Sequence, residues 1–203
     1  MNVLEQVASQ AGPRRRVLVS VTNKDGIAEL ARALVAMNWE IISTGGTADT
    51  IRKAGVPVTL VSTVTNFPEI LDGRVKTLHP NVHGGILANR SKVEHMRTIV
   101  GEGIEPIDMV IVNLYNFEAK PSIEEIDIGG PAMLRSAAKN AAYVIVIVDP
   151  VDYEMVLKGL ASGDFSLRQR EALAYKVFRH TADYDNEIAK WMANKLNDQQ
   201  SFL

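Results

Sequence analysis

The amino-acid sequence predicts an α/β protein with a central, mainly parallel sheet and a helical C-terminal extension. Three observations support this fold class. Short β-branched segments alternate with segments of helical periodicity in the first part of the chain, as expected for strands joined by crossover helices. Two later segments are continuously apolar, which is typical of strands covered on both faces. Beyond Pro150 the periodicity is helical.

The predicted strands share β-branched or continuously apolar residues. The first reads Arg-Val-Leu-Val-Ser-Val, and the last two are apolar almost throughout, which places them at the centre of the sheet. In chain order, strands are predicted at 16–21, 40–43, 58–61, 108–113 and 143–148.

Helices are predicted where apolar residues recur every three to four positions. Ile27, Leu30 and Leu34 mark the first of them, Gly55 is the expected stop of the second, and Pro131 suits the first turn of the third. The predicted helices are 25–37, 47–54, 131–139, 152–160 and 167–196, with a turn at 162–164 before the last.

Composition indicates one globular unit. The 203 residues are 46% hydrophobic and 23% charged, which is ordinary for a packed domain. We expect an α/β nucleotide-binding core in residues 1–150 and a helical extension of the same unit in residues 151–203. No linker or internal repeat separates the two parts.

Charge and cysteine content exclude several classes of function. The formal net charge of −2 gives no general attraction for nucleic acid or anionic membranes, so any anion site must be local. The chain has no cysteine, hence no disulfide framework or thiolate metal site. No apolar run approaches the roughly 20 residues needed to cross a bilayer, and residues 1–12 show no export signal. We expect a cytoplasmic protein.

The segment 72–85 contains the densest group of candidate ligand-binding residues. Arg74 and Lys76 supply cations and Thr77 a hydroxyl donor, a set that suits an anionic, oxygen-rich ligand. The segment has no helical or strand periodicity, and Pro80 is expected to end any helix there. From these residues alone, a solvated loop and a binding site are equally open.

Two histidines in this segment do not predict a metal site. His79 and His83 lie four residues apart, but Pro80 between them argues against a regular helix. No glutamate or cysteine follows at zinc-site spacing. We therefore expect no metal site here.

A phosphate site is predicted where the second strand passes into a helix. Thr44-Gly-Gly-Thr47 would place backbone N–H groups at the positive end of the helix dipole. Ser20, Thr22 and Lys24 follow the first strand and would reach the same edge of the sheet. Together they form a candidate phosphate cradle, although a simple tight turn with capping residues remains the alternative.

Further polar groups lie at the ends of later elements. Asn113 and Tyr115 end a buried strand, and Tyr115 is either a proton donor or a half-buried amphipathic side chain. Asp127 precedes a Gly-Gly-Pro helix start, where it can accept hydrogen bonds while the glycine amides remain free to bind an oxyanion. Arg135 and Lys139 lie four apart on the next helix, where solvated display and approach to a ligand are both open.

Six motifs in a fixed order give the chain a specific resemblance. It resembles the inosine monophosphate cyclohydrolase domain, the N-terminal part of a bifunctional purine-biosynthesis enzyme that also carries a formyltransferase domain. The resemblance runs from about residue 16 to about residue 189, and it implies a methylglyoxal-synthase-like three-layer sandwich. The motifs are Ser20–Lys24, Ser43–Thr47, Asp72–Pro80, Asn113–Tyr115, Ile126–Gly130 and Ala137–Asn140.

The resemblance implies a reaction and a set of residues. The reaction closes 5-formamidoimidazole-4-carboxamide ribotide to inosine monophosphate with loss of water, which is the last step in the de novo synthesis of inosine monophosphate. It requires no metal and no organic cofactor. Lys139 would be the proton donor and acceptor, Lys76 would steady developing charge, and Tyr115 and Asp127 would orient the reacting groups. The implied substrate-binding residues are Ser20, Thr22, Asn23, Lys24, Thr44, Gly45, Gly46, Thr47, Arg74, Val75, Thr77, Val112, Asn113, Ile128 and Gly129.

The sequence departs from the family pattern in three places. Asn116 stands where a proline usually follows the Leu-Tyr pair, and the segment 118–125 is shorter than usual. The chain ends at Leu203, where the family continues into the formyltransferase domain. We expect either an excised domain or a free-standing enzyme, supplied with substrate by a linked or separate formyltransferase.

We also have expectations about the assembly of the protein and about its alternative functions. The resemblance implies a homodimer that acts on a small purine ribotide, with no nucleic-acid or membrane partner. One alternative is methylglyoxal synthase, which has this fold and a phosphate site. The other is a non-catalytic module that senses purine nucleotides, which would need only the phosphate cradle.

Overall fold

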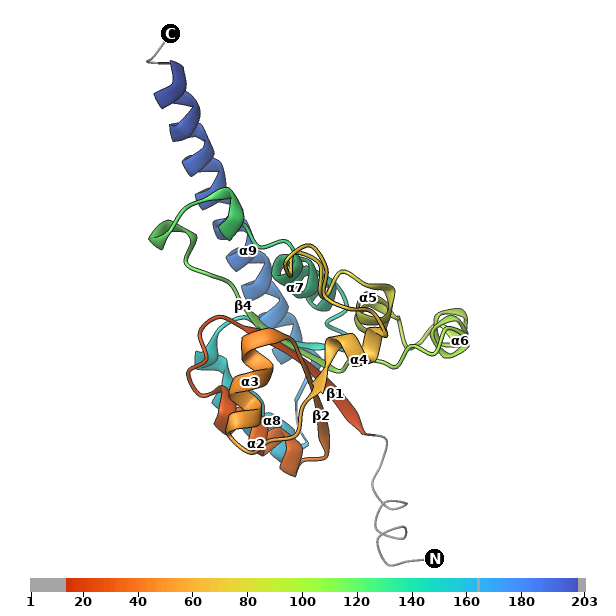
Figure 1. Cartoon of the computed structure of the whole chain (residues 1–203). Helices are drawn as coiled ribbons and strands as arrows, with labels where there is room; N and C mark the ends of the chain where they lie inside the picture. The colour runs from red at the N-terminus through yellow and green to blue at the C-terminus, as the bar shows by residue number, and fades with distance from the viewer. Residues whose placement is uncertain (1–13, 164, 201–203) are drawn as a thin grey trace, which may run out of the picture.

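The structure is a computed structural model that describes residues 14–163 and 165–200 (Figure 1). The region 1–12, in which we predict no export signal, and Asp164 of the predicted turn lie outside these residues. A five-stranded, wholly parallel sheet forms the centre, in the order β3-β2-β1-β4-β5. The strands are β1 (Arg15–Val21), β2 (Trp39–Ser43), β3 (Thr59–Leu60), β4 (Met109–Asn113) and β5 (Ile145–Ile147).

Helices connect the strands and cover both faces of the sheet. The α-helices are α2 (Ile27–Ala36), α3 (Gly45–Lys53), α4 (Val61–Thr65), α5 (Pro80–Leu87), α6 (Val93–Gly101), α7 (Gly129–Lys139), α8 (Tyr153–Ser162) and α9 (Leu167–Gln200). Short 3-10 helices occur at η1 (Phe117–Ala119), η2 (Ile123–Glu125) and η3 (Pro150–Asp152). None of the helices in the described part of the chain has the length and apolar character that crossing a bilayer requires.

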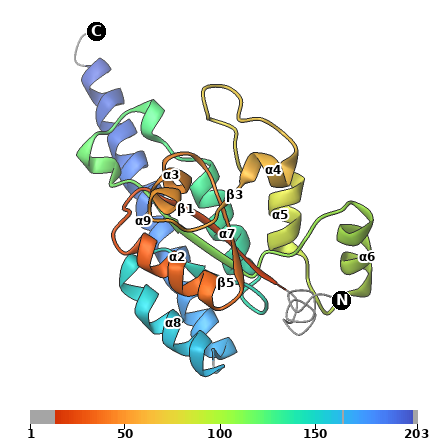
Figure 2. The ribbon, with the colours of Figure 1, turned by 60° about the horizontal axis from the view of Figure 1, so that its bottom comes forward.

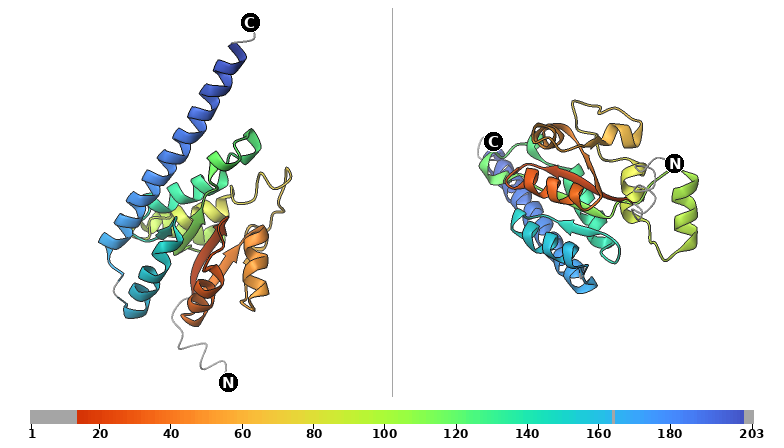
Figure 3. Two further views of the ribbon diagram at one scale, coloured as in Figure 1. Left: turned by 90° about the vertical axis from the view of Figure 1, so that its left-hand side faces the viewer. Right: turned by 90° about the horizontal axis from the view of Figure 1, so that it is seen from below.

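The helices form two layers around the sheet, which confirms the predicted sandwich. On one side, α2 and α3 pack against β1 and β2, and α8 lies beside α2 (Figure 2). On the other side, α7 packs against β4 and β5 and contacts both α5 and α9. The C-terminal part of α9 extends beyond the body of the molecule (Figure 3).

The strand order creates a switch point in the sheet. β1 pairs with β2 through Val17 and Ile41, and with β4 through Val17 and Met109. The chain therefore proceeds outward from β1 in one direction and then returns to continue in the other. In open α/β sheets, ligands bind at the carboxyl ends of the strands at such a point.

One hydrophobic core includes the residues after position 150. Leu18 and Val146 of the sheet are fully buried, and Val177 of α9 packs in the same cluster. Leu173, Val177 and Tyr184, at helical spacing, are the buried side of α9. The helical extension is thus packed against the α/β core.

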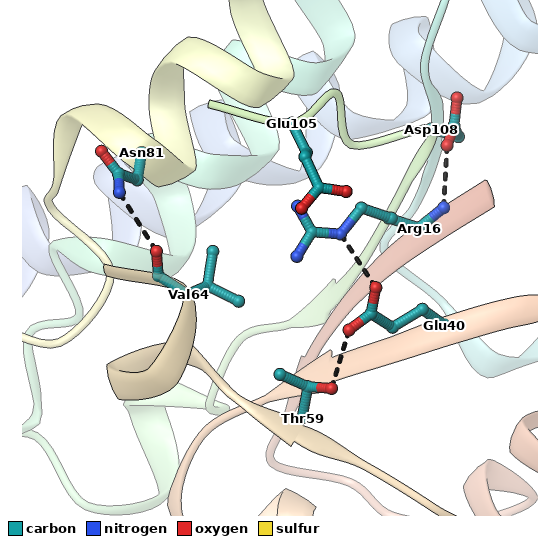
Figure 4. Close-up of polar contacts among 7 residues, drawn as sticks. All are labelled: Arg16, Glu40, Thr59, Val64, Asn81, Glu105 and Asp108. Atoms are coloured by element: carbon teal, nitrogen blue, oxygen red, sulfur yellow. Dashed lines mark hydrogen bonds and ion pairs between the residues drawn. The ribbon is translucent and has the colours of Figure 1, made fainter. Parts of the chain in front are cut away.

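A buried polar network joins the amino ends of the strands (Figure 4). The guanidinium of Arg16 donates to Glu40 at 3.1 Å, and the other carboxylate oxygen of Glu40 accepts from the Thr59 hydroxyl at 2.7 Å. The backbone N–H of Arg16 donates to Asp108 at 2.8 Å. The network therefore links β1, β2, β3 and the residue before β4 at the amino edge of the sheet, opposite the carboxyl edge where ligands bind in such folds.

Two local predictions about the segment that joins β3 to β4 are wrong. The strand expected at 58–61 is only two residues long, because α4 begins at Val61. Pro80 does not end a helix but begins α5, since a proline at the first helical position loses no hydrogen bond. The short α4 and the exposed α6 were not predicted.

Candidate functional site

A cavity of about 1050 Å3 opens at the carboxyl edge of the sheet, where the topology predicts a ligand. Ser20 near the end of β1 and residues that follow β2 and β4 meet there with the start of α7 and a side chain of α9. The residues that line it are Ser20, Thr44, Leu71, Asp72, Gly73, Arg74, Lys76, Thr77, Tyr115, Ile123, Glu124, Glu125, Ile126, Asp127, Ile128, Gly129, Gly130, Met133 and Met192.

Two residues of the predicted phosphate cradle, Ser20 and Thr44, line this cavity, whereas its other members, Thr22, Lys24 and 45–47, are not among the lining residues. Thr44 precedes the first turn of α3, whose backbone N–H groups carry the positive end of the helix dipole. A side chain at Gly46 would contact Lys24, and one at Gly45 would contact the amine of Lys76, so both cations lie near this turn. The Thr47 hydroxyl is instead engaged with the backbone of Val21, so it fixes α3 to β1.

Asn113 holds the loop after β1 in place. Its side-chain oxygen accepts from the backbone N–H groups of Thr22 and Asn23 at 2.7 and 3.0 Å. Its amide nitrogen donates to the carbonyl of Asn23 at 2.9 Å. The Asn113 side chain therefore shapes the cradle from behind and does not line the cavity.

Two cations of the segment 72–78 enter the cavity, each with an acidic partner. The Lys76 amine lies 3.3 Å from Glu69 and packs over Gly73, where a side chain would clash. Arg74 lies 2.5 Å from both carboxylate oxygens of Glu124, which belongs to η2 on the other wall. Neither acid was singled out from the sequence, because their contacts span loops of unpredicted geometry.

Asp127 is held at the start of α7. Its carboxylate accepts from the Gly130 N–H at 3.0 Å, and its own N–H donates to the Tyr184 hydroxyl at 2.8 Å. The expectation that both glycine amides stay free is thus wrong for Gly130. The Tyr184 hydroxyl donates in turn to the Glu125 carbonyl at 3.3 Å, and burial raises the pKa of this hydroxyl.

Gly129 permits a close approach between two walls of the cavity. A side chain there would come within 2.8 Å of the Thr77 hydroxyl, so Thr77 packs directly on the start of α7. Thr77 is buried, whereas Tyr115 and Ile128 at the mouth are about half exposed or more. Val75 bridges back to Ile70 and so forms the base of the loop that carries Arg74.

Some predicted residues lie away from the cavity surface. Lys139 is exposed at the last position of α7, an eleven-residue helix whose first position lines the cavity. Val112 is buried within β4. Conversely, the sequence did not point to Met192, because its approach depends on how α9 crosses the sheet edge.

The two histidines of α5 have structural partners. His79 caps the helix, because its side chain accepts from the Asn81 N–H at 3.1 Å. His83 lies 3.1 Å from the Ser136 hydroxyl, and burial lowers the pKa of its imidazole. Within residues 14–163 and 165–200, no three histidine or acidic side chains are grouped to hold a metal ion.

Comparison with known proteins agrees with this architecture. The family model described as MGS-like domain matches residues 26–139, more than half of the chain. The chain therefore belongs to the family of MGS-like domains. A second model, described as AICARFT/IMPCHase bienzyme, matches residues 137–202. The solved structure of ForH is 37% identical and superposes with a TM-score of 0.81, over 88% of this chain and 97% of that one.

Two curated relatives have higher sequence identity to this chain than ForH has. The bifunctional purine biosynthesis protein PurH of Halalkalibacterium halodurans is 55% identical over 196 residues, which is 92% of this chain and 38% of that protein. PurH of Anoxybacillus flavithermus is 54% identical over 89% of this chain and 37% of that protein. The chain thus spans little more than a third of the length of these relatives.

Proposed function

We propose that this chain is an inosine monophosphate cyclohydrolase, which closes 5-formamidoimidazole-4-carboxamide ribotide to inosine monophosphate and water. The observation that carries the proposal is that Lys76, Tyr115 and Asp127 line one cavity together with Thr44, the residue before α3. The similarity to PurH and the match to the bienzyme model support the same activity.

The ligand's orientation follows from the charges of the cavity. The ribotide phosphate would bind at the start of α3, near Lys24, because that turn offers backbone N–H groups and a helix dipole. The imidazole ring would then lie toward the start of α7. This orientation places the carboxamide and formyl groups between Lys76, Tyr115 and Asp127.

The chemistry asks the site for three things. The carboxamide nitrogen attacks the formyl carbon of the same molecule, so the two groups must be fixed face to face. The former carbonyl oxygen becomes an oxyanion, which the Lys76 ammonium would stabilise. The attacking nitrogen and the formamide nitrogen each lose one proton, and the former carbonyl oxygen takes up two protons and departs as water, so a base and an acid are needed.

Asp127 and Tyr115 are suited to these proton roles. The Asp127 carboxylate is fixed by the Gly130 N–H and would polarise the carboxamide N–H. The Tyr115 hydroxyl lies at the mouth and would donate to the departing oxygen. The proton role of Lys139 rests on the family resemblance alone, since this side chain does not line the cavity.

The test is the absorbance change when the ribotide is added to purified protein. We expect rapid closure by the wild type, loss of closure in Lys76→Ala, and a large loss in Tyr115→Phe, which removes only a hydroxyl. Lys158→Ala on α8 is the matched control, because Lys158 pairs with Glu154 at the surface. Unchanged closure in Lys139→Ala would remove Lys139 from the mechanism without affecting Lys76.

Two results would overturn the proposal. A folded wild type that binds inosine monophosphate but never closes the ribotide would be a nucleotide-sensing module. Release of phosphate from a triose phosphate would identify methylglyoxal synthase. We further propose a cytoplasmic homodimer that receives its substrate from a linked or separate formyltransferase, which sedimentation of the purified chain and coupled assays would test.

A further inference from the structure

Arg74, one of the expected substrate contacts, is already occupied by an acid of the same cavity. Its Nη2 atom lies 2.5 Å from both oxygens of Glu124, and the two residues are fifty positions apart in the chain. Both side chains line the cavity. An anion that binds to Arg74 must therefore displace Glu124 or share the guanidinium with it.

The contact joins two separate walls of the cavity mouth. Arg74 lies on the loop closed by the Ile70–Val75 bridge. Glu124 lies in η2, between β4 and α7. Both side chains are largely exposed, at 65% and 70%, so the pair holds these walls together where the cavity meets solvent.

In an exposed ion pair of this kind, another anion can replace the carboxylate. Exposed ion pairs contribute little to stability because water and salt screen them. A guanidinium binds carboxylates and phosphates with the same set of donors, so a ribotide oxygen can take the place of the Glu124 carboxylate. Glu125, the next residue, pairs with Lys120 instead, so the contact is specific to Glu124.

From these contacts we propose that Glu124 is a positioning residue that holds Arg74 across the mouth of the cavity and is displaced when the anionic ligand binds. The inference rests on the proposed function, because the ligand is the purine ribotide. Glu124 then sets apparent affinity, since part of the binding energy of the ligand is used to break its contact with Arg74.

The test is a double-mutant cycle on the binding of inosine monophosphate, measured by calorimetry at low salt. Glu124→Gln should tighten binding about two- to five-fold, the range that an exposed ion pair allows. Arg74→Gln should weaken binding, and Glu124→Gln added to it should have no further effect. Glu125→Gln removes the same charge from the same wall and should tighten binding less than Glu124→Gln, because the Glu125 carboxylate pairs with Lys120 and not with Arg74.

Several outcomes would overturn the inference. Equal tightening by Glu124→Gln and Glu125→Gln would show a general charge effect, as would full tightening in the Arg74→Gln background. Unchanged binding in Glu124→Gln, with a wild type that binds normally, would refute the inference and leave the proposed function intact. A wild type that binds no inosine monophosphate would refute both.

Kinetics of ring closure provide a second readout. Glu124→Gln should lower KM by the same factor and leave kcat within about two-fold, because the contact exists only before the ligand binds. A fall in kcat with KM unchanged would instead place Glu124 in the reaction itself and contradict the displacement.

Discussion

Because Gly130 has no side chain, its backbone can contact and hold Asp127, a candidate catalytic group. A side chain at this position would overlap the carboxylate of Asp127 and come within 2.9 Å of Leu114. The N–H of Gly130 meanwhile donates to the same carboxylate. Close contact of the backbone with Asp127 is therefore possible only with glycine.

We predict that Gly130→Ala displaces Asp127 and lowers kcat for ring closure at least ten-fold, because misplacing a reacting group raises the barrier steeply. Gly101→Ala is the control, since nothing lies within 4 Å of its added methyl group. Steady-state kinetics and thermal unfolding of both variants check this. Equal activities in the two variants would contradict a positioning role for Gly130.

At the scale of single residues, the sequence indicated which residues belong to the candidate site, but it did not indicate which partners their side chains contact. The motifs named Thr47 and Asn113, but the structure shows Thr47 hydrogen-bonded to the backbone of Val21 in β1 and Asn113 hydrogen-bonded to the backbone of the loop after β1. A sequence gives the residue types that suit a phosphate, and it does not give their partners across the fold. Glu124 was missed for the same reason, because its partner Arg74 comes from a distant loop.

At the scale of elements, α9 is fixed to the core by a lysine between two carboxylates. Lys176 lies 2.8 Å from Asp149 and 2.7 Å from Asp152. The Lys176 hydrogen bond is the main cause that lowers the pKa of Asp149. Burial alone would lower the pKa of Lys176, but its bonds to both carboxylates outweigh burial and raise it.

These shifts define a pH window for the stability of α9 packing. The Asp149 contribution is present above its unfolded pKa of 3.8 and is lost as pH falls through the lower folded value. The Lys176 contribution is present below 10.5 and is lost as pH rises through the higher folded value.

We predict that Lys176→Met lowers the free energy of unfolding by about 1 kcal/mol near neutral pH, a value reduced for solvent screening of partly exposed groups. The difference from wild type should shrink in strong acid and in strong base. Urea unfolding across pH measures it, and Lys158→Met should show a smaller effect because Lys158 and Glu154 are both mostly exposed. A difference independent of pH would mean that lost packing causes the effect.

The type of an element could be predicted where its hydrophobic periodicity was long. The start of a helix could not be predicted where a proline can either begin a helix or end one. The helix 131–139 and the strand 108–113 appear as α7 and β4 within two residues at each end. Pro80 was taken as a stop because a proline inside a helix removes a hydrogen bond. In the first turn that bond does not exist, so the same residue begins α5.

At the scale of the whole molecule, the cavity and the polar network lie at opposite edges of the sheet. Parallel topology, with all strands pointing one way, followed from the alternation of strands and helices and is confirmed. It places the cavity at the carboxyl edge. The amino edge carries the network of Arg16, Glu40 and Thr59, which lines no part of that cavity. Changes at the amino edge should therefore alter stability and leave the site intact.

Glu40→Gln tests this separation. Arg16 and Glu40 side chains are only 8% and 17% exposed, so removing the negative charge leaves a buried guanidinium with poor compensation. We predict a loss of about 3 kcal/mol in the free energy of unfolding, with KM and kcat for the proposed ring closure unchanged in the folded protein. Glu105→Gln is the matched control, since Glu105 is 71% exposed and lies 3.8 Å from Arg16. Urea unfolding and ring-closure kinetics measure both quantities. A Glu40→Gln variant of normal stability but altered KM would show that the amino edge is coupled to the site.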